Sequence, residues 1–219
     1  MKADITKSFL YEHVARIGKA LSSPKRLELI ELLAQGEKTV ETLAAQSRID
    51  VRLASAHLKA LREAHLVETR RDGKFIHYRL SGRDVAELWL GVRDVAEAHL
   101  LELRIALEQM AAAPDLLSAE NRESLLARAR SGDIVVIDVR PATEYEAGHL
   151  PFARSLPLAE LERRLAELPP GKDVVAYCRG PYCVMSDEAV RLLRAHGYSA
   201  HKISDGVIEW QAGGLPLER

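Results

Sequence analysis

The hydrophobic pattern of the chain changes once, near residues 111–117. Before that point apolar residues recur at three-to-five-residue steps, as they do across 5–21, and this spacing predicts amphipathic helices. Beyond it, apolar runs at 134–137 and 174–177 lack alternation, as strands buried on both faces do. Helical segments are predicted around 158–168 and 188–195, and their alternation with these runs predicts that the second half is α/β with a parallel sheet.

Length and composition agree with two small domains, which we place at residues 1–112 and 113–219. With 47% hydrophobic and 29% charged residues in 219, the chain is typical of a globular protein and not of a disordered or collagen-like one. Its apolar runs stay well short of the roughly 20 residues that span a bilayer, and no secretion signal is visible at the amino terminus. Two cysteines are too few for a disulfide framework. We therefore expect a cytoplasmic protein without a membrane partner.

The first domain has the element order of a winged helix-turn-helix. Ser-Pro at 23–24 can begin one helix, Thr39 can cap a short second one, and Asp50 can cap a third over 51–64. Asp-Gly at 72–73, between two segments rich in β-branched and aromatic residues, predicts a hairpin. A long helix is then expected over 84–112, with an apolar stripe wide enough to pack on a second helix or a second subunit.

The net charge of −1 conceals two opposed blocks. Residues 48–83 hold nine basic and four acidic side chains, a net of +5, whereas residues 84–113 hold six acidic and two basic ones, a net of −4. A basic block on a helix and a hairpin is the electrostatic footprint of a nucleic-acid-binding surface. The alternative is a basic face that is only solvated, and the order of the elements favours DNA over it.

The expected DNA contacts follow from this geometry. The helix over 51–64 fits the major groove, and the hairpin tip would lie along a neighbouring backbone or minor groove. Residues near the helix start are placed to reach base edges, and those further along are better placed for phosphate. The candidate DNA-binding residues are Arg52, Ser55, Ala56, Lys59 and Arg62 on the helix, and Arg70, Arg71 and Lys74 at the tip.

Residues 53–80 resemble the winged-helix repressors of the ArsR type. The match rests on His57-Leu58, Leu61-Arg62, Leu66-Val67, the Arg71–Lys74 turn and Tyr78-Arg79-Leu80, and the similarity covers about residues 10–110. The resemblance implies a homodimer that binds double-stranded operator DNA and is joined through its first helix and residues 84–112.

Many regulators of this type sense metals, and here the sequence departs from them. The cysteine pair of the family is absent, and residues 41–43 stand in its place. On the last helix only His99 and Glu102 match half of another metal site of the family. We interpret His99, His57 and His65 as structural, and predict neither a metal nor a cofactor.

Cys178 directly follows the buried run 174–177, and the segment to Cys183 leads into a helix that begins near Met185. Open parallel sheets carry their sites at the carboxyl ends of strands. A loop that enters a helix N-terminus turns backbone N–H groups inward, which favours an anion there and eases loss of the thiol proton. Arg179 adds positive charge. The pattern predicts a nucleophilic Cys178, and two inert buried cysteines are the alternative.

The second half carries several separated motifs, namely Asp138-Val139-Arg140, Glu144-Tyr145, Gly148-His149-Leu150, Ala153, Leu156-Pro157 and Asp205–Trp210. Together they resemble a single-domain rhodanese over about residues 118–217. This resemblance implies that Cys178 carries a persulfide sulfur, taken from a donor and passed to a thiol or cyanide. It also implies that Asp138, Arg140, Gly180 and Tyr182 support the loop rather than do chemistry. The similar phosphatase loop is one residue longer, so ester hydrolysis is not expected.

Cys183 occupies the sixth place of the loop, where rhodaneses commonly carry a basic residue. Its presence weakens the case for fast turnover of thiosulfate, an anion that such a residue would hold. A second thiol there could attack a persulfide on Cys178 and close a disulfide. We therefore count Cys178, Arg179 and Cys183 as the reactive residues.

Two hypotheses for the whole chain follow. In the first, it is a transcriptional regulator, and by our interpretation a repressor, whose rhodanese domain senses a small sulfur donor or an oxidant at Cys178. In the second, it is a sulfurtransferase that uses the winged helix for localisation or dimerisation. The basic block favours the first. Thiosulfate or persulfide sulfurtransferase activity stays open, as does the choice among sulfur, selenium and arsenic species as the signal.

Overall fold

The computed structural model describes residues 6–110, 117–118 and 121–219. The chain divides into two compact units, Met1–Gly91 and Val92–Arg219, which are described separately below. The domain boundary expected at 112/113 falls outside the described residues and stays a prediction. None of the described helices combines the length with the apolar character that a membrane span requires.

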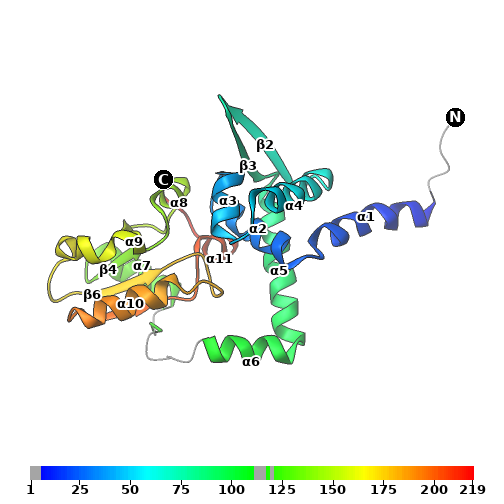
Figure 1. The fold of residues 1–219 in the computed structure, drawn as a ribbon. Helices are drawn as coiled ribbons and strands as arrows, with labels where there is room; N and C mark the ends of the chain where they lie inside the picture. Colours follow the sequence, from blue (N-terminus) through cyan, green and yellow to red (C-terminus); the bar gives the residue numbers. More distant parts are fainter. Residues whose placement is uncertain (1–5, 111–116, 119–120) are drawn as a thin grey trace. The chain divides into compact units, whose positions relative to one another are not determined.

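The first unit is a winged helix-turn-helix, and its elements can be followed along the colours of Figure 1. The two-residue strand β1, which the sequence pattern had not indicated, pairs with β3, so that the sheet has the antiparallel order β1-β3-β2. The elements are α1 Lys7–Leu21, α2 Pro24–Ala34, β1 Lys38–Thr39, α3 Val40–Gln46, α4 Val51–Glu63, β2 Val67–Asp72, β3 Phe75–Leu80 and the start of α5 Arg83–His99.

Local signals explain where these helices and strands begin. The Thr39 hydroxyl accepts a hydrogen bond from the Thr42 N–H at 3.3 Å and so caps α3, and the Asp50 carboxylate accepts one from the Leu53 N–H at 2.9 Å and caps α4. At the hairpin tip Gly73 has a φ of +59°, a conformation in which a Cβ would be strained. These caps and the hairpin confirm the predicted element order.

The helix predicted over 84–112 is interrupted. α5 ends at His99, and α6 runs over Leu101–Met110 in the second unit. The Leu100 carbonyl accepts hydrogen bonds from the N–H groups of Leu103 and Arg104, so that it starts the second helix. Neither proline nor glycine marks the break, which is why the apolar periodicity alone predicted a single helix. The end of the predicted helix, at 111–112, lies outside the described residues.

The second unit is built on a four-stranded parallel sheet of order β5-β4-β6-β7. Its predicted helix over about 158–168 is an α-helical turn followed by a 3₁₀ segment, and α7, α8 and α11 were not predicted. The elements after α6 are α7 Arg122–Ser131, β4 Ile134–Asp138, α8 Ala142–Ala147, β5 Arg154–Ser155, α9 Leu158–Leu161, η2 Glu162–Glu167, β6 Asp173–Tyr177, α10 Met185–Ala195, β7 Ala200–Lys202 and α11 Val207–Ala212.

Both faces of this sheet are covered, as the lack of alternation in its strands predicted. Val135 and Ile137 of β4 pack into a core cluster that includes Leu193 of α10. Val136 points to the opposite face, into a second cluster with Trp210 of α11. Because successive side chains of a strand point to opposite faces, a strand buried on both sides is apolar at every position. The α/β class predicted for this half is confirmed.

Candidate functional site

A reactive loop, defined here as residues 178–184, connects the carboxyl end of β6 to the start of α10. Cys178 is 2% exposed, and its Sγ lies 3.4 Å from the Ser186 hydroxyl and 3.4 Å from the Cys183 carbonyl. The strand therefore places the thiol at the sheet edge, and α10 supplies Ser186 beneath it. This is the position that the sequence predicted for Cys178.

The Cys178 thiol is activated by hydrogen bonds. Burial by itself raises the pKa of Cys178. Hydrogen-bond donors in the loop and in α10 lower it by more, so that the pKa is about 6 instead of the ordinary 9.0. The donors are the Cys183 thiol, the Ser186 hydroxyl and N–H, and the Gly180 N–H. At neutral pH Cys178 is consequently a thiolate, which is the nucleophilic form of cysteine.

Cys183 keeps its proton. The hydrogen bond to the Cys178 thiolate raises its pKa above the ordinary value, and burial and the negative charge of Cys178 raise it further. The structure thus brings the two cysteines of the chain together as a thiolate and a thiol that donates to it. The sequence had placed both in one loop but had not indicated this hydrogen bond.

Arg179, in the reactive loop, forms an ion pair with a carboxylate outside it. Its guanidinium donates to both oxygens of Glu144, at 3.0 Å and 2.7 Å, and Glu144 is 1% exposed. A buried bidentate pair of this kind is strong and directional. The sequence had named Glu144 only as part of a family motif, and its role as the partner of Arg179 was missed.

Asp138 and Arg140 form a fully buried ion pair at the carboxyl end of β4, with 2.6 Å between Nη2 and Oδ2. Asp138 lies opposite Tyr177 in the parallel register, and the Tyr177 hydroxyl donates to its Oδ2 at 2.6 Å. Arg140 also donates to the Gly148 carbonyl at 2.8 Å. These contacts join the ends of β4 and β6, the strand that leads to Cys178.

Two glycines allow the loop to pack closely against residues 205–209. Gly180 has a φ of +142°, and a Cβ on it would lie 3.0 Å from a carboxylate oxygen of Glu209. A Cβ on Gly206 would lie only 2.3 Å from the Arg179 carbonyl oxygen. Glu209 also accepts a hydrogen bond from the Gly206 N–H at 2.9 Å. Gly180 therefore has a conformational reason to be glycine, whereas the sequence had not indicated the role of Gly206.

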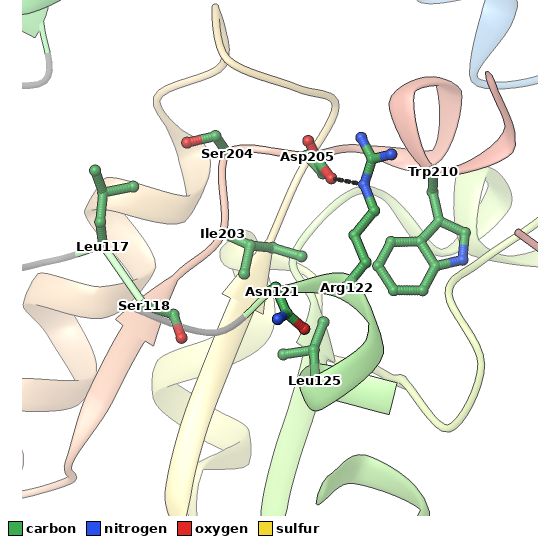
Figure 2. Close-up of a pocket in the computed structure, with 9 residues that line it drawn as sticks. All are labelled: Leu117, Ser118, Asn121, Arg122, Leu125, Ile203, Ser204, Asp205 and Trp210. Carbon is green, nitrogen blue, oxygen red and sulfur yellow. Dashed lines mark hydrogen bonds and ion pairs between the residues drawn. The ribbon is translucent and has the colours of Figure 1, made fainter. Parts of the chain in front are cut away.

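Two cavities lie near the carboxyl end of β7. Figure 2 shows the larger, of about 360 Å³, in which the Arg122 side chain reaches from α7 to an ion pair with Asp205 at 2.5 Å beside the Trp210 ring. The smaller, of about 130 Å³, is lined in part by Cys183, Ser186 and Lys202. Neither was predicted, because their walls come from segments far apart in the sequence.

In the first unit, α4 turns Ala54, Leu58 and Leu61 inward, and all three are fully buried. The side chains predicted to contact DNA lie on the opposite, exposed face of α4, away from the core, as a surface that binds DNA requires. At the wing, Arg70 is exposed but pairs with Glu37 at 2.6 Å, a partner that the sequence did not indicate. The predicted contacts, all exposed, are Arg52, Ser55, Ala56, Lys59, Arg62, Arg70, Arg71 and Lys74.

No cluster of three or more His, Cys, Asp or Glu side chains fit to hold a metal ion occurs within the described residues. His57 is half-buried, and burial followed by the nearby charges of Arg26 and Lys25 lowers its pKa. A neutral histidine on the inner side of α4 fits the structural interpretation made from the sequence.

Comparison with known proteins gives the family. Residues 23–69 match the model of the arsR family of bacterial regulatory proteins, and residues 121–213 match the rhodanese-like domain. An HTH-type transcriptional regulator of Mycobacterium tuberculosis is 45% identical over 212 residues, which cover 97% of this chain and 93% of that protein. The chain belongs to the ArsR family of transcriptional regulators. It is a DNA-binding winged-helix regulator with a C-terminal rhodanese domain.

Other relatives match one half of this ArsR-family regulator. A sulfurtransferase of Allochromatium vinosum is 35% identical over 97 residues, 43% of this chain and 89% of that protein. A biofilm growth-associated repressor of Xylella fastidiosa is 44% identical over 75 residues, 34% of this chain and 66% of that protein. The solution structure of a homodimeric winged helix-turn-helix DNA-binding domain from Mycobacterium bovis is 44% identical and covers 47% of this chain and 94% of that one, with a TM-score of 0.42.

The pKa of Cys178 generates a prediction about its reactivity. The rate of alkylation by iodoacetamide is expected to rise with pH, to reach half its maximum near pH 6 and to level off above, because only the thiolate reacts. Ser186→Ala removes a hydrogen-bond donor to the thiolate and should shift this midpoint upward. Mass spectrometry of the peptide that contains Cys178 follows the reaction. A midpoint near the ordinary thiol value in the wild type would contradict the activation.

The buried pair of Asp138 and Arg140 generates a prediction about stability. Asp138→Ala leaves a buried guanidinium uncompensated and should lower the free energy of unfolding by about 3–5 kcal/mol. Chemical denaturation monitored by circular dichroism measures the change, with Glu146→Ala, at an exposed position of α8, as the control. A loss as small as that of the control would show that the pair is not required.

Proposed function

We propose that this regulator is a repressor that senses reactive sulfur, or a related thiol-reactive oxidant, through Cys178. The observation that carries the proposal is the placement of a buried Cys178 thiolate and a protonated Cys183 thiol in one loop, with the Cys178 Sγ 3.4 Å from the Cys183 carbonyl. A thiolate held beside a second thiol is suited to take up sulfur and then to resolve it as a disulfide.

The chemistry needs two balanced steps. The Cys178 thiolate attacks the outer sulfur of a hydropersulfide R–S–SH, the S–S bond of the donor breaks, and R–S⁻ leaves with the electron pair, so that Cys178 becomes a persulfide. The Cys183 thiol then attacks the inner sulfur of that persulfide, a Cys178–Cys183 disulfide forms, and the outer sulfur leaves as H₂S with the protons of both groups. An oxidant that converts the thiolate to a sulfenic acid would lead to the same disulfide with loss of water.

Formation of the disulfide would remove both the Cys178 thiolate and the Cys183 thiol proton, and with them the hydrogen bond between the two groups. The Cys183 proton no longer points to a thiolate, and the charge that Ser186 and Gly180 stabilise is gone. Because these donors belong to the loop and to α10, their rearrangement is the physical signal that we propose is transmitted to DNA affinity.

We propose that the DNA is double-stranded operator DNA and that a homodimer binds it. The exposed cationic face of α4 and the wing support this. So do the exposed apolar side chains of α1, among them Phe9 and Val14, which lie on the helix expected at the dimer interface. Because DNA is its partner, the protein is proposed to be cytoplasmic. The proposed domains are residues 1–112, which bind DNA, and residues 113–219, which form the rhodanese domain.

The second candidate is a sulfurtransferase. The low pKa of Cys178 favours it, since a thiolate on a reactive loop is also what persulfide transfer to an external thiol needs. In that case the disulfide would be a side product, and DNA affinity would not depend on the state of the cysteines. The titration described next separates the two candidates.

The DNA affinity of the full chain should depend on the cysteines. We expect the Kd for DNA from upstream of its own gene to differ by about tenfold or more between the reduced and the disulfide form, within the usual range of allosteric coupling. Fluorescence anisotropy measures it. Cys178→Ser and Cys183→Ser, which cannot close the disulfide, should keep one affinity under the same treatment. Equal affinity of the two wild-type forms would favour the sulfurtransferase.

Charge reversal tests the DNA-binding face. Arg52→Glu with Lys59→Glu should weaken binding by about a hundredfold or more, because phosphate contacts are replaced by repulsion. Arg163→Glu with Arg191→Glu changes the net charge equally at exposed positions of the second unit and is the matched control. Gel shifts at one fixed salt concentration measure both. Unchanged affinity of the first variant, with its fold intact by circular dichroism, would overturn this assignment.

A further inference from the structure

The charges around the reactive loop are balanced in pairs. Four basic side chains in the loop, or against segments that contact it, are each joined to a carboxylate of the second unit. The pairs are Arg179 with Glu144 at 2.7 Å, Lys202 with Asp187 at 2.6 Å, Arg93 with Glu209 at 2.5 Å and Arg122 with Asp205 at 2.5 Å. Arg93 has two further carboxylates near it, Glu97 at 3.5 Å and Asp94 at 3.6 Å.

Two of these pairs lie directly at the loop. Arg179 is part of the loop, and the carboxylate of its buried partner Glu144 lies in direct contact with the guanidinium. Arg93 lies over the ring of Tyr182 in the loop, with 5.9 Å between its Cζ and the ring centroid, and is itself buried against Glu209. Each of these two guanidinium groups is therefore offset by a carboxylate, and neither presents an uncompensated positive charge to an anion in the loop.

The cavity at Cys183 is also neutral. Its charged lining residues are Asp187 and Lys202, whose side chains form an ion pair at 2.6 Å. Cys183 lines the same cavity with a protonated thiol. A small molecule that enters this cavity meets hydrogen-bond donors and the ion pair of Asp187 and Lys202. A dianion would lose its hydration there without gaining an unpaired cation as a partner.

We propose that the reactive loop takes sulfur from hydropersulfides, which transfer a sulfur atom that carries no more than one negative charge, and discriminates against thiosulfate, which is a dianion. This rests on the proposed function and specifies the donor that it would use. The step is the one given above, in which the Cys178 thiolate takes the outer sulfur and R–S⁻ leaves. With thiosulfate the same attack would release sulfite, with two negative charges in the neutral loop.

The test compares two donors on the full chain. Cysteine hydropersulfide and sodium thiosulfate are supplied separately, and the rate at which Cys178 gains one sulfur atom is followed by mass spectrometry. The ratio of the thiosulfate rate constant to the hydropersulfide rate constant is the measured quantity, because it cancels changes in Cys178 reactivity. Cys183→Arg adds a cation in the loop, and Cys183→Gln adds a long uncharged side chain as its matched control.

We expect this ratio to be about tenfold or more higher in Cys183→Arg than in Cys183→Gln, since a cation at short range favours the dianion. Asp187→Asn leaves Lys202 without its carboxylate and should raise the ratio above that of the wild type without a change at either cysteine. Equal ratios in the arginine and glutamine variants, or a wild type that loads as fast from thiosulfate as from hydropersulfide, would overturn the donor class.

The same experiment separates this inference from the proposed function. If the wild type loads Cys178 at the same rate from both donors, sulfur sensing stands and the discrimination is wrong. If neither donor loads Cys178, or if Cys178→Ser gains sulfur at the rate of the wild type, the proposed sensing of sulfur at Cys178 fails and the donor class fails with it.

Discussion

A buried thiolate needs hydrogen-bond donors, and the stabilisation of Cys178 is the constraint on which the second unit depends. At 2% exposure the charge receives little help from water, so that its low pKa requires Cys183, Ser186 and Gly180 to be held in place as donors. The loop can adopt this conformation because Gly180 takes a positive φ. The buried pair of Asp138 and Arg140 joins the strand ends beneath it.

The two units use charge in opposite ways. In the first, α4 holds leucines in the core and leaves basic side chains such as Arg52 and Lys59 exposed, which is what attraction to a polyanion requires. In the second, the basic side chains near the reactive loop are neutralised by carboxylates, Arg179 by Glu144 among them. The cationic face of the first unit and the paired cations around Cys178 therefore suit different partners.

The sequence was a good guide wherever a local signal existed. The caps at Thr39 and Asp50, the turn at Gly73 and the place of Cys178 after a buried strand were predicted, because each depends on residues within a few positions of one another. The helix break at Leu100 was not, because no proline or glycine accompanies it. For the candidate site, the two cysteines were found from their spacing.

By itself, the sequence determined the element order, the separation of charge between residues 48–83 and 84–113, and the presence of two thiols in one loop. These follow from periodicity, composition and spacing, which are properties of neighbouring residues. Only the tertiary structure decided that Arg179 faces Glu144, that Gly206 packs on the loop and that Cys183 donates its proton to Cys178. The reason is that the first two join positions brought together by the parallel sheet, and the third depends on how the seven-residue reactive loop folds at the edge of that sheet.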